Sequence, residues 1–367
     1  MKILPFKAVY PDMAEFITRD VDFKRVRDEY PLLRKDNFFK KLRKKAFYIY
    51  QICGKKKHTG IIVNNALEDY LQNRILGHEK TLAIKESAIV GIASSCNAMT
   101  KPVLLTYLDN DEIHHWVSEY TGINKPLLEI RFDDNDEIQR LWKVSNEAYI
   151  SQLKTLFYDH IPLAYIADGH HRSSALVDLL KNKTASGTDQ DGLLCAYFPF
   201  SALEIYDFSR VVRIRHGLRI HDILDRLPEF CYVQPLQVHE KPTEKHMLTM
   251  FTSTGAYALV WKPDWLKNVL AGGLTTDVEI FNKYILEEVF KVHNLNDTGQ
   301  IEYVNGKESL QHLIQLAQEI DVAVFNFFPL TMQEIVEISN AGKTLPPKST
   351  WFEPRIKNGI IIQEFRK

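Results

Sequence analysis

Hydrophobic and polar positions alternate over the first part of the chain in a way that predicts strands joined by short turns. Residues 46–53 (AFYIYQIC) and 59–63 (TGIIV) flank Gly54 and three lysines, a pattern that predicts a β-hairpin with a solvated tip. Further apolar runs predict strands at 101–108, 114–117, 126–132, 162–167, 193–200 and 322–328. Spacing near 3.6 residues predicts helices at 65–75, 136–157, 173–180, 221–227, 278–290 and 332–339, with loops at 184–192 and 342–350.

This mixture of strands and helices indicates an α/β (mixed α+β) chain. The 367 residues are enough for two domains, and the character of the sequence shifts near Val212. We therefore expect one domain at 1–212 and a second α/β lobe at 213–367. Hydrophobic residues make up 45% and charged residues 25%, the balance of an ordinary globular protein.

Charge and cysteine content narrow the function further. The net charge is −1, whereas a protein that grips duplex DNA through its phosphates usually has a basic excess, so DNA is disfavoured as a partner. Four separated cysteines without a C-x-x-C pair fit a reducing compartment. Charges interrupt each apolar run before membrane length, and the N-terminal residues lack a signal-peptide core. We expect a cytoplasmic protein with no membrane partner.

The segment DGHHR, residues 168–172, carries the strongest chemical signal. It follows an apolar strand and opens a helix, so the unpaired N–H groups of the first helical turn would favour an anion. Gly169 permits a sharp turn, and Arg172 offers donors suited to phosphate oxygens. His170 and His171 add hydrogen-bonding groups, and Asp168 is a candidate magnesium ligand. The alternative is a surface turn with Asp168 as a helix cap.

Two further polar motifs flank this one in the sequence. In GHEKT, residues 77–81, a carboxylate between His78 and Lys80 has the surroundings of a general base, although on local grounds alone an exposed charged turn is the favoured explanation. In PPKST, residues 346–350, an ammonium and two hydroxyls follow two prolines, which suits phosphate or carboxylate binding; an ordinary polar loop is the alternative.

These three motifs, in this order, are similar to those of an uncharacterised bacterial family often labelled ParB-like, and through it the chain resembles the free L-serine kinases of the ParB/sulfiredoxin superfamily. IADGHHRSSAL is similar to the kinases' signature sequence, and Gly169, Arg172 and Ala175 match the superfamily spacing. GHEKT resembles the element with the kinases' catalytic glutamate, here Glu79. GKTLPPKST resembles their late Pro-Lys-[Ser/Thr]-Thr element. The chain differs in a longer gap before Asp168, an insertion at about 99–157, and in Trp351–Phe352 where the kinases have a histidine.

The resemblance implies a ParB/sulfiredoxin-like nucleotide-binding core at 1–212, with the 213–367 lobe contributing the PPKST loop. It implies a nucleotide-dependent phosphotransferase that uses ATP or ADP with Mg²⁺ on a small hydroxylated metabolite, free L-serine being the first candidate. The implied catalytic residues are Glu79 as the base, Asp168, which would also hold the metal, and His170. The implied cofactor-binding residues are Gly169, His170, His171, Arg172, Lys348, Ser349 and Thr350, and the implied substrate-binding residues are His78, Thr81, Lys348 and Thr350.

Two other classes of protein remain open at this point. One is a nucleotide-sensing protein without catalysis. The other is a nucleotide-operated DNA-binding switch like ParB, which would need a helix-turn-helix and a basic face after the DGHHR motif; the residues after Leu176 instead predict a loop and a buried strand. The oligomeric state is left open.

Overall fold

The chain folds into two compact units. The computed structural model describes residues 1–16, 23, 25–132, 136–185, 192–215, 217–273, 275–295 and 299–365. Unit 1 comprises Met1–Glu204, Val336–Thr344 and Pro354–Lys367, and unit 2 comprises Ile205–Ile335 and Leu345–Glu353. This division differs from the predicted boundary at 212/213 in two ways: it falls after Glu204, and the last segment of the chain returns to unit 1.

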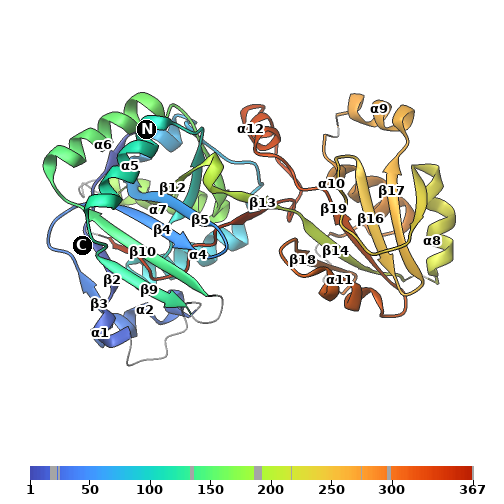
Figure 1. Cartoon of the computed structure of the whole chain (residues 1–367), viewed down its shortest axis with the longest axis horizontal. Coiled ribbons are helices and arrows are strands. Elements are labelled where there is room, and N and C mark those ends of the chain that lie inside the picture. Colours follow the sequence, from blue (N-terminus) through green and yellow to red (C-terminus); the bar gives the residue numbers. More distant parts are fainter. Residues whose placement is uncertain are drawn as a thin grey trace. The chain divides into compact units, whose positions relative to one another are not determined.

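Unit 1 is built on a mixed sheet, nine-stranded within the described residues (Figure 1). In spatial order its strands are β6 (Ile75–Leu76), β11 (Ala164–Asp168), β8 (Val103–Tyr107), β12 (Leu193–Pro199), β5 (Lys57–Asn65), β4 (Phe47–Cys53), β10 (Glu137–Val144) and β9 (Leu128–Phe132), and β1 (Ile3–Leu4) pairs with β5. A smaller sheet has the order β3 (Phe39–Lys41), β2 (Ala8–Pro11), β21 (Ile362–Glu364) and β7 (Ala98–Met99). Because β21 inserts between β2 and β7, the C-terminal strand holds the N-terminal part of unit 1 together.

The helices of unit 1 cover the sheet in pairs, α4 packing against α7 and α5 against α6 (Figure 1). They are α1 (Met13–Phe16), α2 (Val26–Lys35), α3 (Leu67–Leu71), α4 (Ala83–Cys96), α5 (Asp111–Ile123), α6 (Glu147–His160) and α7 (His170–Ala185), with a short 3₁₀ turn at Phe200–Ala202. The central strand β4 reads FYIYQIC and is buried on both faces up to Ile52, as expected for an apolar run covered by helices.

Unit 2 has a sheet of its own. Its order is β15 (Cys231–Leu236), β17 (Gly255–Trp261), β16 (Met247–Thr252), β19 (Val322–Phe327), β14 (Phe208–Arg213) and β18 (Ile301–Asn305), and all its pairings are antiparallel. The helices are α8 (Ile220–Arg226), a 3₁₀ turn at Leu227–Glu229, α9 (Pro263–Ala271), α10 (Asp277–Ile280) running into a π-helix at Phe281–Val289, α11 (Leu310–Ala317) and α12 (Met332–Asn340), which crosses the boundary between the units. Strands β13 (Glu204–Tyr206) and β20 (Trp351–Glu353) form a separate pair.

Most predicted elements are confirmed. The hairpin is β4–β5, with Tyr48 opposite Ile62 and with exposed lysines at its tip. The strands at 101–108, 126–132, 162–167, 193–200 and 322–328 are β8, β9, β11, β12 and β19, and the helices at 173–180, 221–227, 278–290 and 332–339 are also present. Of the loop predicted at 184–192, residues 186–191 lie outside the described residues, and Thr184 and Ala185 still belong to α7.

Three predicted elements are wrong in whole or in part. Residues 114–117 lie in α5 rather than in a strand, because Asn110 caps the helix by accepting the N–H of Ile113 at 3.0 Å. The helix predicted at 136–157 is a strand up to Val144, paired with both β4 and β9, and a helix only after Asn146, which caps α6. The helix predicted at 65–75 is limited to α3, since its two ends belong to strands β5 and β6.

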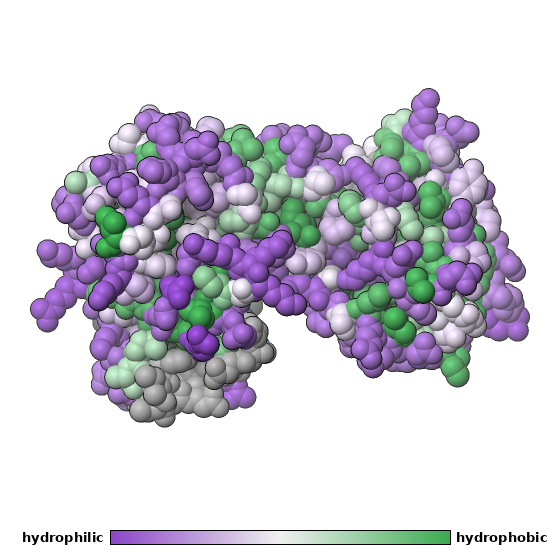
Figure 2. Space-filling model, viewed as in Figure 1, coloured by the Kyte–Doolittle hydropathy of each residue, from purple (hydrophilic) through white to green (hydrophobic). Residues whose placement is uncertain are grey.

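The surface of both units is mainly hydrophilic on the face shown in Figure 2, with apolar residues scattered among polar ones. Among the described residues, the structure contains no helix with the length and apolar character needed to cross a membrane.

Gly60 provides a test of the packing in the centre of the sheet. A Cβ at this position would lie 2.6 Å from the carbonyl oxygen of Tyr197 and 2.7 Å from the ring of Phe198. We expect Gly60→Ala to lower the free energy of unfolding by about 1–3 kcal/mol, as for other overpacked sites. Chemical denaturation measures this change. Gly54→Ala at the open hairpin tip, with no atom within 4 Å of the added Cβ, is the matched control and should change stability by less than about 0.5 kcal/mol.

Candidate active site

The turn between β11 and α7 is the centre of the candidate site. Strand β11 ends at Asp168, and α7 begins at His170, so a single residue, Gly169, makes the turn. Gly169 has φ +104°, which L side chains rarely adopt, and a Cβ there would lie 2.7 Å from a guanidinium nitrogen of Arg172. The first helical hydrogen bond runs from the N–H of Ser173 to the carbonyl of Gly169 at 2.8 Å. The preceding N–H groups lack helical acceptors, so the turn favours an anion.

Three cations surround the carboxylate of Asp168. Arg172 approaches Oδ2 at 2.7 Å, Arg355 approaches Oδ1 at 2.9 Å, and Lys101 lies 3.6 Å from Oδ2. Burial alone would raise the pKa of Asp168, but the charges of Arg172, Lys101 and Arg355 hold it well below its usual value. Burial, together with the charge of Arg172, lowers the pKa of Lys101 to about 8. Three positive charges facing one negative charge leave this end of the helix positive.

A pocket of about 260 Å³ adjoins this cluster. Lys101 and Arg172 line it together with Thr100 and Arg27, and side chains of α4 and α7, among them Ile92 and Leu176, form apolar walls. Arg172 donates to the carbonyl of Pro102 at 3.4 Å, while its buried Nε has no hydrogen-bond partner within the described part of the chain. The pocket therefore presents positive charge and an apolar surface to the same ligand.

On the other side of the turn, His170 faces Glu79. The Nδ1 atom of His170 lies 3.5 Å from Oε2 of Glu79, and its Nε2 lies 3.2 Å from the backbone nitrogen of His78, which donates to it. Because Nε2 accepts this bond, the single proton of the neutral ring sits on Nδ1 and points at Glu79. Burial and neighbouring His78 place the pKa of His170 well below its ordinary value, so the ring is neutral at pH 7. The Glu79 side chain is 28% exposed, accessible to a ligand.

His78, Glu79 and His170 also form the kind of cluster that can hold a metal ion. Their ligand atoms lie within 4.8 Å of one another. Binding a metal through Nδ1 of His170 would require its proton to leave or to move to Nε2, which already accepts a hydrogen bond from His78. The observed arrangement therefore fits a close pair of Glu79 and neutral His170 better than a metal centre.

Asp168 does not fit the magnesium role expected of it. Both of its oxygens already face cations, so a divalent ion would have to enter against three positive charges. Its observed contacts instead fix the positions of Arg172 and Arg355.

Thr81 of the GHEKT motif and His171 of the DGHHR motif both contact α4, His171 from the first turn of α7. His171 accepts the N–H of Leu82 at 3.2 Å, at the start of α4. Hydrogen bonds from Thr81 and Ser174 lower the pKa of Glu86. Thr81 and His171 thus have structural contacts of their own, which sequence reasoning did not assign to them.

The PPKST loop lies in unit 2. Lys348 is exposed, has φ +60°, and its Nζ lies 5.1 Å from the centre of the Phe208 ring. Fully buried Arg210 donates to the carbonyl of Lys348 at 3.0 Å and so holds the loop. Ser349 is buried and donates to the carbonyl of Pro346 at 2.7 Å, which commits its hydroxyl to the loop itself. Thr350 is also buried.

Sequence reasoning missed Lys101, Arg355 and the wall of the pocket. Lys101 precedes strand β8, and Arg355 follows Pro354 near the C-terminus, each as an isolated basic residue. Neither belongs to a spaced motif, and only the pairing of β11 with β8 and the return of the C-terminal segment bring them to Asp168.

The sequence matches the profile of a protein family described as protein of unknown function (DUF1015) over residues 8–290. The chain belongs to this family. Membership of an uncharacterised family is thus confirmed, and no curated protein matches the sequence.

Several solved structures share a distant likeness with the chain. A free serine kinase mutant in complex with ADP is 14% identical, with a TM-score of 0.41, and the match covers 84% of this chain and 95% of that one. SbnI with a C-terminal truncation, from Staphylococcus aureus, is 13% identical with a TM-score of 0.42, covering 81% and 85%. A conserved hypothetical protein from Pyrococcus furiosus is 13% identical with a TM-score of 0.39, covering 83% and 95%. At these values we assign no residue a role from them.

The buried histidines predict a loss of stability in mild acid. Burial lowers the pKa of His78 to about 4, whereas an unfolded histidine titrates near 6.5. Between these two pKa values, His78 is protonated in the unfolded chain but not in the folded chain. The free energy of unfolding therefore falls as the pH decreases. We expect His78→Asn to reduce the loss of unfolding free energy between pH 6.5 and pH 5 by about 1–2 kcal/mol.

Urea denaturation at several pH values measures this difference. The control is His115→Asn, because His115 is exposed on α5 and should leave the pH dependence unchanged. An identical slope in His78→Asn and wild type would show that His78 titrates normally in the folded state.

Proposed function

We propose that the protein is a phosphotransferase that binds a nucleotide at the β11–α7 turn and transfers a phosphoryl group to a small hydroxylated metabolite. One observation carries the proposal: a glutamate held by a neutral histidine and a cluster of three cations lie on either side of the same turn, residues 168–172. Phosphoryl transfer requires positive charge at the phosphates and a base at the acceptor hydroxyl.

The residues at the turn fit a nucleotide phosphate. A side chain at position 169 would collide with the Arg172 guanidinium, and Gly169 avoids this collision. The backbone N–H groups of His170 and His171 lie in the first turn of α7, where no helical carbonyl accepts them. Arg172 offers a buried Nε with no hydrogen-bond partner in the described structure, and Lys101 adds a charge nearby. A bound nucleotide, ATP or ADP, would supply its terminal phosphoryl group, whose bond to the bridging oxygen breaks and leaves ADP or AMP as the leaving group.

Glu79 is the proposed base, and it would take the proton of the acceptor hydroxyl as the new bond to phosphorus forms. His170 directs its Nδ1 proton at the Glu79 carboxylate and, being neutral at pH 7, orients the glutamate without neutralising it. This role for His170 replaces the contact with the donor phosphates implied by the resemblance, because the buried ring has both nitrogens directed at protein groups.

The identity of the acceptor follows from the resemblance rather than from the geometry of the turn. Free L-serine is the first candidate, and Lys348 with Thr350 are proposed contacts to substrate or phosphate. Magnesium would reach this site with the nucleotide rather than on Asp168, whose charge is already neutralised by Arg172, Lys101 and Arg355.

The cation cluster should dominate nucleotide affinity. We expect Arg172→Ala to weaken ADP binding by about 1.5–3 kcal/mol, the range for hydrogen bonds to charged groups, when affinity is measured by calorimetry with magnesium present. Arg131→Ala removes an exposed arginine of β9 in the same unit and should leave the affinity unchanged. Equal affinities for ADP in wild type and Arg172→Ala would remove Arg172 from the site.

Glu79 should matter for turnover and not for nucleotide binding. We expect Glu79→Gln to lower the rate of phosphoryl transfer about 10²–10⁴-fold, the usual share of general acid–base catalysis, with ADP affinity nearly unchanged. The measurement pairs calorimetry with phosphorus NMR, using ATP or ADP as the donor and a panel of hydroxylated amino acids led by serine. Glu119→Gln, an exposed glutamate on α5, is the control.

Two outcomes of this experiment would contradict the proposal. Transfer at the wild-type rate by Glu79→Gln would exclude Glu79 as the base. Tight nucleotide binding without phosphorylation of any acceptor by the wild type would favour the nucleotide-sensing alternative instead.

A further inference from the structure

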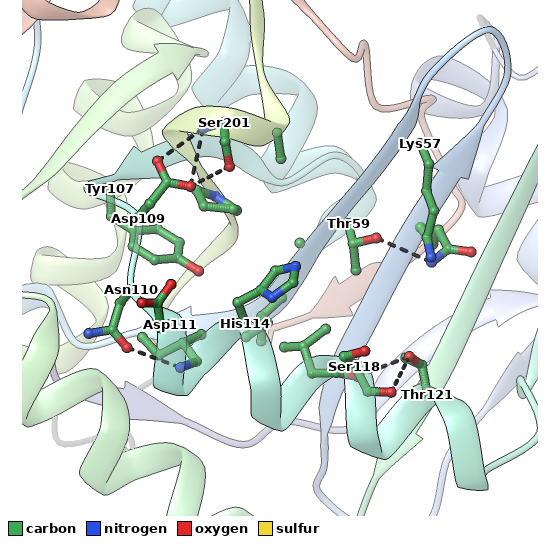
Figure 3. Close-up of a pocket in the computed structure, with 17 residues that line it drawn as sticks. Lys57, Thr59, Tyr107, Asp109, Asn110, Asp111, His114, Ser118, Thr121 and Ser201 are labelled. Atoms are coloured by element: carbon green, nitrogen blue, oxygen red, sulfur yellow. Dashed lines mark hydrogen bonds between the residues drawn. The ribbon is translucent and has the colours of Figure 1, made fainter.

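A second pocket lies in unit 1 at the opposite end of strand β8 from the candidate active site (Figure 3). Asp168 is opposite Leu104, near the start of β8, whereas the pocket begins at Tyr107, the last residue of that strand. Three residues of strand separate these positions by roughly 10 Å along the sheet. The pocket therefore does not share its lining with the phosphate-binding turn.

The pocket has the size of a small-molecule site. Its volume is about 460 Å³, within the roughly 300–1,000 Å³ usual for ligand pockets. The start of β5, the end of β8, helix α5 and the segment after β12 form its walls. Ile61, Ile113 and Val117 provide apolar surface, and most of the other lining groups are polar.

The segment after β12 is fixed to the wall by several contacts. Ser201 donates both its N–H, at 3.1 Å, and its hydroxyl to the carboxylate of Asp109. His58 is hydrogen bonded through Nδ1 to the carbonyl of Ala202 at 2.7 Å, and Lys56 pairs with Glu204. These contacts join the segment after β12 to the start of β5 and to the end of β8. The walls of the pocket are therefore fixed by hydrogen bonds and an ion pair within unit 1.

Tyr107 distinguishes this pocket from an ordinary surface hollow. Its side chain is 4% exposed, and Figure 3 shows its hydroxyl directed into the pocket beside Asp111 and His114. No hydrogen bond satisfies this hydroxyl within the residues that the structure describes. Burial and the charge of Asp109 raise the pKa of Tyr107, so the group keeps its proton. Because its oxygen faces the pocket while the rest of the side chain is buried, the hydroxyl is placed to bond a ligand or water there.

The charge of the pocket indicates what it would bind. Two carboxylates, Asp109 and Asp111, lie at one end, and Lys57 lies at the other (Figure 3). Acidic residues in a first helical turn are common because they stabilise the helix, so Asp111 alone would indicate nothing. With Asp109 and the Tyr107 hydroxyl beside it, Asp111 becomes one wall of a polar site that favours a positive group.

We propose that this pocket is a second binding site, for a small hydroxylated amine whose ammonium group lies at Asp109 and Asp111 and whose hydroxyl groups reach Tyr107 and His114. The site goes beyond the proposed phosphoryl transfer and does not depend on it. Nine of its seventeen lining residues lie within residues 99–157, the segment expected from the sequence to be an insertion, so the proposal gives that segment a role in binding a ligand.

The test uses three probes of similar size and different charge: 4-aminobutanol, 1,4-butanediol and 4-hydroxybutyrate. Binding to the full chain is followed by NMR titration. We expect the amine to bind in the millimolar range or tighter and about 10-fold more strongly than the anion, because a charge-assisted hydrogen bond contributes about that factor. Asp111→Asn and Tyr107→Phe should each weaken the amine about 5–10-fold.

Each variant has a control with the same chemical change elsewhere. Asp159→Asn and Tyr158→Phe alter exposed residues of α6 that do not line the pocket and should leave binding of the amine unchanged. Stronger binding of 4-hydroxybutyrate, equal binding by Asp111→Asn and wild type, or no binding of the amine in the millimolar range would each overturn the proposal. Circular dichroism on each variant confirms that it is folded, and ADP affinity, measured alongside, should not change.

Discussion

The candidate active site depends on the carboxylate of Asp168, because three separate parts of the chain meet on it. Arg172 belongs to the helix that follows, Lys101 precedes strand β8, and Arg355 lies in the segment that returns from unit 2. Without this negative charge the three cations would repel one another at the start of α7. With it, they remain close together and still carry more positive charge than Asp168 neutralises.

The turn at Gly169 separates a cluster of cations from a carboxylate. One side is positive and suits an anion, while the other holds Glu79 against a neutral His170. A single glycine makes this possible, since Gly169 lets a strand in the sheet continue at once into a helix. In the proposed phosphoryl transfer, this separation would let the Glu79 carboxylate and the cations act on the same ligand without pairing with each other.

Unit 1 carries both proposed sites, at opposite ends of its strands. Strand β8 connects them, because its start lies beside Asp168 and its end supplies Tyr107. The two pockets differ in charge: Arg172 and Lys101 line the first, whereas in the second Asp109 and Asp111 outnumber Lys57. A chain of nearly balanced net charge thus concentrates opposite charges in two pockets, which its composition does not reveal.

The sequence by itself determined the local features of the site. An apolar strand ending in Asp168, a turning glycine and a helix opening with two histidines are recognisable because each depends on neighbouring residues. The hairpin, most strands and the start of α7 follow for the same reason. Only the tertiary structure decided the partners: the pairing of His170 with Glu79, the convergence of Lys101 and Arg355 on Asp168, and the burial of Tyr107. It also decided the state of residues 137–144, whose spacing suited a helix but which pair with two strands. These outcomes depend on contacts between residues tens to hundreds of positions apart, and burial and charge at such contacts override local propensity.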